Sequence, residues 1–451
     1  MTSNNKNKNN HSKNNIPAHS VDTRELALEM LIEINERGEF SHIVLRSVLD
    51  KYQYLPKQDR AFMTRLVDGT IEYMLQLDYI IDSFSKTKVK KMKPFIRNLL
   101  RMSVYQIKYM DAVPDSAVCN EAVKLAKRHK FAQLSGFVNG VLRNIARNID
   151  SVQLDTLSIR YSMPQWIVDR FVAAYGEKKA EEIFKAFHSK STISIRTNLT
   201  RCTSDELRAM LEAEGVTVTA VDELNYAFVI SGFDYLNGLQ SFRDGLFYVQ
   251  DISSMLVAQT AAPKKGDYVI DVCAAPGGKS THIAELMQGS GHVLARDLTD
   301  TKVGMLEENI ERHGLNNMSA EVWDATVPDT DSVGKADILI CDLPCSGLGV
   351  LGRKKDIRYK MTPESVDELV ALQRQILDTV YTYVKPNGVL VYSTCTIDEA
   401  ENEDNVRWFV EKHPEFELDK SFADGAGMKQ ILPGEHGSDG FFIARFIKSK
   451  S

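Results

Sequence analysis

The sequence of 451 residues lacks the features expected of a membrane protein or of a secreted, disulfide-bonded protein. No apolar run approaches the roughly 18 residues that a membrane-spanning helix needs, and no apolar signal core stands at the N-terminus. The six cysteines include no C-x-x-C pair, which argues against a disulfide framework, a zinc site and a dithiol redox pair. We therefore expect a cytoplasmic protein with free thiols, no membrane segment and no metal.

A P-loop for ATP is also absent, although one segment looks similar. The segment DVCAAPGGKSTH, residues 271–282, combines glycines with a lysine and a hydroxyl residue. A P-loop requires a glycine five positions before its last glycine, and counting back from Gly278 reaches Cys273. The segment therefore indicates a loop for a different nucleotide-like ligand.

Basic residues do not exceed acidic ones in the whole chain, but the charge is unevenly distributed. Residues 21–150 carry 21 basic and 16 acidic side chains, whereas residues 151–451 carry 31 and 45. A basic front joined to an acidic back indicates that any contact with nucleic acid is concentrated at the front.

Composition and hydrophobic spacing divide the chain into four parts. The Asn- and Lys-rich stretch 1–20 has almost nothing to bury and is predicted to be a disordered tail. Residues 21–150 show helical spacing throughout and predict an all-α domain, with Thr23 as the N-cap of its first helix. Residues 151–240 mix two strand patterns with two helical ones and predict a small α+β module.

Residues 241–451 predict a Rossmann-like α/β domain with a mostly parallel sheet, because short apolar runs alternate with helical stretches. Ligands of such sheets bind outside the carboxyl ends of the strands. The residues that end these runs are therefore the candidate site residues. The runs are 267–273, 292–297, 319–325, 336–345 and 387–396.

The first run ends in a loop whose glycines let the backbone approach a ligand, before a helix that begins near Lys279 or Ser280. A lysine at a helix N-terminus opposes the helix dipole by roughly 0.3–1 kcal/mol. We therefore expect Lys279 to contact an anion, either a ligand carboxylate or an RNA phosphate; a solvated surface lysine is the alternative.

Two acids end the next runs. Asp297 lies 24 residues after Cys273, the distance at which an acid typically binds ribose hydroxyls, and Asp324 could accept from an adenine amino group. Either acid alone has an ordinary explanation as a helix cap or surface residue. Together, at successive strand ends, they predict an adenosine-binding crevice.

Two cysteines, Cys345 and Cys395, lie at or just beyond the ends of the last two runs, beside this crevice. A thiolate is useful where the target carbon cannot attack unaided. Carbon 5 of cytosine is such a target, because it becomes nucleophilic only after a thiolate adds to carbon 6 and can then take a methyl group from a sulfonium donor. The alternative for each thiol is a buried small side chain, and it fits Cys273 and Cys341 better.

The motifs of residues 241–451 resemble those of the Sun (Fmu) family of RNA 5-methylcytosine methyltransferases, which use S-adenosylmethionine. The matching segments are VQDISS at 249–254, DVCAAPGGKSTH at 271–282, CDLPCSGLGV at 341–350, YSTCTIDEAENE at 392–403 and DGFFIARF at 439–446.

This resemblance implies a role for each matching residue. Asp297 would bind the ribose, Asp324 the adenine, and Asp342 would lie between cofactor and base. Cys395 would be the nucleophile and Cys345 would assist product release, a choice that the residues alone leave open. The methionine end of the cofactor would be held by Cys273, Ala274, Ala275, Pro276, Gly277, Gly278 and Lys279.

Residues 21–148 also resemble the helical RNA-binding domain of the NusB family, with AVCNEAVKLAKRHK followed by FVNGVLRNIAR as the characteristic part. The combination implies a monomeric enzyme that acts on RNA, above all 16S ribosomal RNA. A transfer RNA methyltransferase or a non-catalytic ribosome-assembly factor remains the alternative. Candidate RNA contacts are Lys86, Lys88, Lys90, Lys91, Lys93, Lys127, Arg128 and, in the middle module, Arg196.

Overall fold

The computed structural model describes residues 21–189 and 192–450, so the predicted disordered tail 1–20 lies outside the described residues. The described chain forms two compact units. One comprises residues 21–70 and 81–149, and the other comprises residues 71–80 and 150–450. Within the described part, no helix has both the length and the apolar character to cross a membrane.

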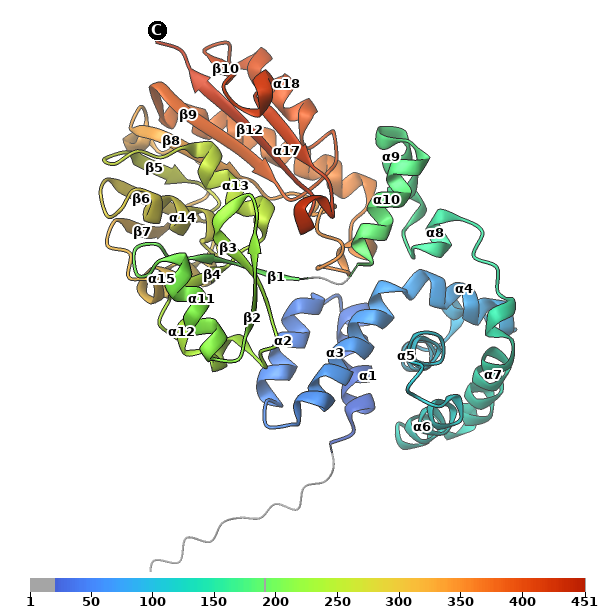
Figure 1. Cartoon of the computed structure of the whole chain (residues 1–451). Coiled ribbons are helices and arrows are strands. Elements are labelled where there is room, and N and C mark those ends of the chain that lie inside the picture. Colours follow the sequence, from blue (N-terminus) through green and yellow to red (C-terminus); the bar gives the residue numbers. More distant parts are fainter. Residues whose placement is uncertain (1–20, 190–191, 451) are drawn as a thin grey trace, which may run out of the picture. The chain divides into compact units, whose positions relative to one another are not determined.

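The first unit is helical, as predicted (Figure 1). The helical spacing runs without a break through residues 60–84, but the structure has two helices there, separated at Tyr73. The helices that build or enter this unit are α1 (Thr23–Arg37), α2 (Ser41–Lys51), α3 (Lys57–Glu72), α4 (Met74–Phe84), α5 (Pro94–Tyr109), α6 (Asp115–Arg128) and α7 (Ser135–Asn148).

The first helix begins one residue earlier than the predicted cap implies. The Asp22 carboxylate, rather than Thr23, accepts hydrogen bonds from the backbone N–H groups of Arg24 and Glu25 at 3.1 and 3.2 Å. A carboxylate suits this position because it also complements the positive end of the helix dipole. The helix ends at Gly38, whose φ of 83° is left-handed.

The second unit contains a small antiparallel sheet in the order β2-β3-β1-β4. Its last strand lies beyond the predicted module boundary at residue 240. Because residues 150–450 form one compact unit, that boundary stays a prediction. The sheet and its helices are β1 (Ile193–Thr197), α11 (Ser204–Ala213), β2 (Thr217–Val221), β3 (Leu224–Ser231), α12 (Gln240–Arg243) and β4 (Phe247–Val249).

The larger sheet has eight strands in the order β10-β12-β9-β8-β5-β6-β7, with β11 paired to β12 (Figure 1). Strands β5 to β9 are parallel, and β12 is antiparallel to β9. The strands are β5 (Tyr268–Asp271), β6 (His292–Asp297), β7 (Met318–Val322), β8 (Ala336–Asp342), β9 (Val384–Thr394), β10 (Phe416–Leu418), β11 (Met428–Ile431) and β12 (Phe441–Lys448).

Helices cover both faces of this sheet, because its central strands are apolar on both sides. One cluster of buried side chains joins the sheet to α13 (Ile252–Ala261), α14 (Gly278–Leu286) and α15 (Asp300–His313). A second cluster joins the opposite face to α17 (Pro363–Val380) and α18 (Glu403–Lys412). This is the doubly wound arrangement that the sequence predicted.

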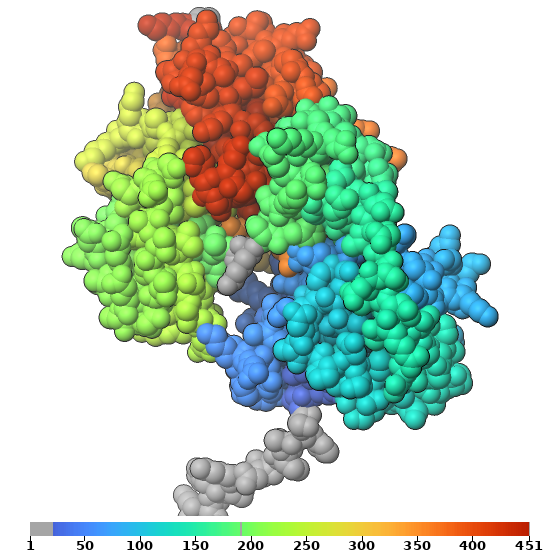
Figure 2. Space-filling view, turned by 45° about the vertical axis from the view of Figure 1, so that its right-hand side comes forward, coloured from blue at the N-terminus to red at the C-terminus, as the bar shows by residue number. Residues whose placement is uncertain are grey.

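Two helices before the small sheet, α9 (Gln165–Tyr175) and α10 (Glu177–Phe187), pack against the loop that follows β9. The Tyr175 hydroxyl donates to the Ile397 carbonyl at 2.6 Å, and the Arg170 guanidinium donates to Asp398 at 3.0 Å. Figure 2 shows these green helices against the red C-terminal part of the chain. They hold the backbone immediately after Cys395.

Candidate active site

The parallel strands have their topological switch point between β5 and β8. The chain runs from β5 to β6 and β7 on one side, while β8 and β9 lie on the other. A crevice at the carboxyl ends of the strands is expected at this point. Asp271 ends β5 and Asp342 ends β8, so both acids border it.

The loop from Cys273 to Lys279 leads from β5 into α14. Gly277 has a left-handed φ of 107°, and a Cβ there would lie 3.0 Å from a methyl group of Leu306. The left-handed conformation therefore favours glycine at this position, and any side chain would also crowd Leu306. The helix begins at Gly278, one residue before the predicted start, so its first N–H groups border the crevice.

Asp297 joins this loop to the end of β6. Its carboxylate accepts from the Ala275 N–H at 3.0 Å and from the Leu298 N–H at 2.8 Å, and Lys302 Nζ lies 2.9 Å away. The side chain is almost fully buried. The sequence predicted that this acid ends a strand next to the loop, and the structure places it there.

Asp271 was missed as a site residue, although it opens the motif that drew attention to the loop. It is buried and accepts hydrogen bonds from the Ser280 hydroxyl and from the Cys273 N–H. Burial raises its pKa to about 7 despite the Ser280 hydrogen bond. The acid orients both ends of the loop.

Lys279 does contact an anion, but that anion belongs to the protein. Its Nζ lies 2.6 Å from Asp342 Oδ2 and 5.2 Å from the centre of the Phe441 ring. Asp342 Oδ1 accepts from the Ser393 hydroxyl at 2.8 Å. Burial opposes the charge on Lys279, but Asp342 raises its pKa, so the ammonium stays charged beside β8 and β9.

The two cysteines meet as their positions in the sequence predicted. Cys395 follows β9, Cys345 lies three residues after β8, and their Sγ atoms are 3.3 Å apart. The Cys345 thiol hydrogen-bonds to Cys395 and lowers its pKa, with help from the positive charges of Lys354 and Lys279. The same hydrogen bond and burial raise the pKa of Cys345 well above its usual value. The charges and hydrogen bond around the pair therefore favour the thiolate at Cys395 over that at Cys345.

A buried acid, which sequence reasoning missed, fixes the two cysteine loops. Glu401 Oε1 accepts from the Ser346 N–H and from Gln373 Nε2, both at 2.9 Å, and Oε2 accepts from the Ser346 hydroxyl. The same hydroxyl lies 2.9 Å from that of Thr396, which follows Cys395. The motif YSTCTIDEAENE contains this glutamate, but its partner lies 55 residues earlier.

Asp324 lies at the same edge of the sheet but is exposed. Strand β7 ends at Val322, two residues before it, and its carboxylate accepts from the Thr326 N–H and hydroxyl at 2.9 and 2.7 Å. The structure thus places it as a turn-forming acid, and its predicted adenine contact stays a prediction. Cys273 and Cys341 match the interpretation as small side chains in the interior, because burial raises the pKa of each thiol.

The predicted RNA contacts fall into three groups. Arg128 is exposed but paired with Asp22 and Glu25. Arg196 corrects the sequence interpretation: it is fully buried and bonds to Glu285, Gln250 and Thr281, so its guanidinium is not available to RNA. The remaining candidates are all exposed on the first unit: Lys86, Lys88, Lys90, Lys91, Lys93 and Lys127.

These residues fit S-adenosylmethionine. The N-terminus of α14 suits the cofactor carboxylate, and the backbone at Gly277 allows a close approach. Asp297 at the end of β6 suits ribose hydroxyls, and Asp342, which contacts Lys279 and Ser393, borders the crevice at the end of β8.

Comparisons with known proteins identify three successive parts of the chain. The NusB family matches residues 21–147, the ferredoxin-like domain of RsmF/B-like methyltransferases matches residues 163–233, and the 16S rRNA methyltransferase RsmB/F family matches residues 258–447. The predicted fold class is therefore confirmed, with the middle module identified as ferredoxin-like.

Relatives cover nearly the full length. A probable ribosomal RNA small subunit methyltransferase B from Bacillus subtilis (strain 168) is 38% identical over 94% of this chain and 98% of its own. One from Synechocystis is 33% identical over 95% and 100%. The crystal structure of PH0851 is 26% identical with a TM-score of 0.82, over 95% of this chain and 99% of that chain. The chain therefore belongs to the RsmB/F family of 16S rRNA methyltransferases and is an S-adenosylmethionine-dependent RNA methyltransferase.

Proposed function

We propose that this enzyme forms 5-methylcytosine in 16S ribosomal RNA, with Cys395 as the nucleophile and Cys345 as the residue that assists release. The observation that carries the proposal is the pair of thiols 3.3 Å apart, beside Lys279 and Asp342, at the strand ends that border the cofactor crevice. The names of the relatives from Bacillus subtilis and Synechocystis support ribosomal RNA of the small subunit as the substrate.

The first step uses the lowered pKa of Cys395. Its thiolate adds to carbon 6 of cytosine, and the electron pair of the 5,6 double bond makes carbon 5 nucleophilic. S-adenosylmethionine, when bound, supplies the electrophilic methyl group that carbon 5 takes. Lys279 contributes a fixed positive charge beside the reacting sulfur, and Asp342 keeps that charge in place.

The second step uses Cys345. After carbon 5 is methylated, it still carries its proton, and the thiolate form of Cys345 accepts that proton. The electron pair of the broken bond between carbon 5 and hydrogen re-forms the 5,6 double bond, the bond between carbon 6 and sulfur breaks, and its electron pair returns to Cys395. Because the resting pKa of Cys345 is raised, Cys345 must first lose its own proton to solvent. Without Cys345, removal of the proton from carbon 5 is expected to be slow, and the adduct with Cys395 should persist.

RNA handling is assigned to both units. The target cytosine must leave its stack to reach Cys395, at a cost of a few kcal/mol. The lysines of the helical unit, which belongs to the NusB family, would supply phosphate contacts, and Asp324 would bind the adenine of the cofactor. Both thiols come from one chain, which suits a monomer, and the chemistry uses free thiols in a reducing cytoplasm without a metal.

The roles of the two cysteines are tested by covalent trapping. Cys395→Ala should abolish methyl transfer while S-adenosylmethionine still binds. Cys345→Ala should accumulate an RNA–protein adduct that survives denaturing electrophoresis. Cys202→Ala, which removes a half-buried thiol of the small sheet, is the matched control and should behave as the wild type. An adduct that requires Cys345 and forms without Cys395 would reverse the two roles.

A further inference from the structure

A second cavity lies within the second unit, away from the cofactor crevice. It has a volume of about 580 Å³, which is within the range of about 300–1,000 Å³ typical of small-molecule sites. Four segments line it: the end of β1 with the loop after it, Tyr226 of β3, the carboxyl-terminal half of α14 with the turn beyond it, and the turn after α15. The cofactor loop joins α14 at Gly278, whereas Glu285 and Leu286 at the other end of this helix line the cavity, about 10 Å away along its axis.

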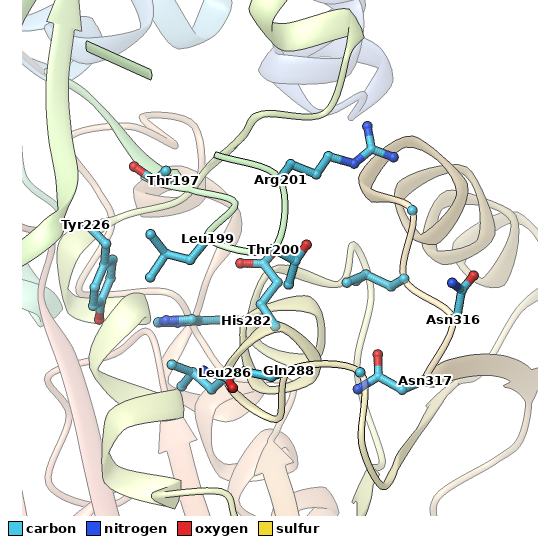
Figure 3. Close-up of a pocket in the computed structure, with 14 residues that line it drawn as sticks. Thr197, Leu199, Thr200, Arg201, Tyr226, His282, Leu286, Gln288, Asn316 and Asn317 are labelled. Carbon is cyan, nitrogen blue, oxygen red and sulfur yellow. The ribbon is translucent and has the colours of Figure 1, made fainter. Parts of the chain in front are cut away.

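One wall of this cavity is aromatic and polar. Figure 3 shows Tyr226 and His282 side by side on this wall, and their ring centres are 5.2 Å apart. The Tyr226 hydroxyl, His282 Nδ1 and Thr197 Oγ1 have no hydrogen-bond partner among the residues that the structure describes, although all three side chains are more than nine-tenths buried. Burial lowers the pKa of His282 well below its usual value, so the ring is neutral and offers one donor and one acceptor.

The opposite side carries amides and a cation. Figure 3 shows Asn316 and Asn317 on the side away from Tyr226 and His282, with Arg201 at the rim. Asn317 Nδ2 donates to the Ala284 carbonyl at 3.0 Å, which leaves its amide oxygen as an acceptor. Arg201 is exposed, its guanidinium donates to the Asp244 carbonyl, and a Cβ on Gly314 would clash with it, so its position is constrained. Glu285, which also lines the cavity, is paired with Arg196, so its charge is already balanced.

We propose that this cavity binds a nucleoside monophosphate unit, with its base between the Tyr226–His282 wall and the two asparagines and its phosphate at Arg201. A flat base matches the aromatic and leucine surface, and its polar edge matches the amides and the unpartnered hydroxyls. A phosphate matches the guanidinium, which binds phosphate in a fixed planar geometry. The unit can come from a nucleotide of the RNA substrate or from a free nucleotide.

The experiment measures binding of the four nucleoside 5′-monophosphates and their nucleosides by ligand-observed NMR, with the full-length enzyme saturated with S-adenosylhomocysteine. That saturation keeps adenosine-like probes out of the cofactor crevice. We expect at least one monophosphate to bind about tenfold or more tightly than its nucleoside, as a charge-assisted contact provides. Arg201→Gln should remove this difference and leave the nucleoside affinity unchanged.

Two further variants complete the test. Asn316→Asp replaces an exposed amide by a negatively charged carboxylate of the same shape. Its repulsion of the phosphate should weaken binding of the monophosphate by a similar factor. Arg243→Gln removes an exposed arginine of the same module outside the cavity and should change nothing. Displacement of the bound monophosphate by substrate RNA would assign the unit to RNA, and failure of RNA to displace it would assign it to a free nucleotide. The proposal is overturned if no monophosphate binds below millimolar concentration, or if binding is the same in Arg201→Gln and Asn316→Asp as in the wild type.

Discussion

Replacing Arg196 with methionine tests whether this side chain stabilises the protein interior or contacts RNA, as its sequence context suggested. The guanidinium is fully buried and donates to Gln250 Oε1 at 2.9 Å, to Thr281 Oγ1 at 3.1 Å and to Glu285. It joins the small sheet, through β1, to α14 of the methyltransferase sheet. Methionine would leave the Glu285 carboxylate buried without its cation.

The magnitude follows from that unpaired charge. Removing one partner of a buried ion pair typically costs about 3–5 kcal/mol, because the remaining charge keeps its desolvation penalty. We therefore predict that Arg196→Met lowers the free energy of unfolding by this amount. The double variant Arg196→Met/Glu285→Met removes both charges and should recover a large part of the loss.

The assay is urea unfolding followed by circular dichroism, together with RNA affinity measured at a temperature where the variant is still folded. Arg243→Met, an exposed arginine in the same module, is the control and should change the unfolding free energy by less than about 0.5 kcal/mol. A variant Arg196→Met that unfolds at the same urea concentration as the wild type but binds RNA more weakly would refute the interior role of Arg196.

Three further predictions concern other side chains. Glu72 lies 3.0 Å from His188 and 2.9 Å from Lys355, and although burial opposes ionisation, these partners lower its pKa from 4.5 to about 2. Glu72→Gln should therefore lower the free energy of unfolding by up to about 3 kcal/mol at pH 7. A depressed pKa stabilises the fold fully only above the pKa of the unfolded chain, so the difference from the wild type should shrink as urea titrations are repeated from pH 4.5 downward. An equal loss of unfolding free energy at pH 3.5 and pH 7 would contradict this. Glu401→Gln should lower kcat about tenfold or more through displacement of the cysteine loops while KM for S-adenosylmethionine is unchanged, whereas general misfolding would change both. Replacing Lys86, Lys88, Lys90, Lys91 and Lys93 by glutamine should weaken RNA binding. The slope of log affinity against log salt concentration, measured at several salt concentrations, should fall by nearly one unit for each phosphate that is no longer neutralised. An unchanged slope would exclude these lysines as phosphate-binding residues.

The architecture of the catalytic domain was predictable from the sequence because its signals are local. Apolar runs that alternate with helical stretches predict a parallel sheet, and the polar residues that end such runs are brought to one edge by the topology. Asp297, Cys345 and Cys395 were all found in this way.

The pairings between distant segments were not predictable. Arg196 stands in a strand that alternates as an exposed strand does, and nothing near it indicates that Glu285, 89 residues later, lies opposite. Asp342, 63 residues away, lies beside Lys279, and nothing near either residue indicates this pair. Such partners depend on how the sheets and helices pack, which short-range spacing does not encode.

Cytosine C5 methylation of 16S ribosomal RNA is tested most directly by bisulfite sequencing of total RNA from cells with and without the active enzyme, using Cys395→Ala as the inactive form. The proposed mechanism predicts one or more small-subunit ribosomal RNA cytosines that resist deamination only when Cys395 is present. Protection confined to transfer RNA would support the thiol chemistry but contradict ribosomal RNA as the substrate. No cytosine whose protection depends on Cys395 would contradict the proposed reaction itself.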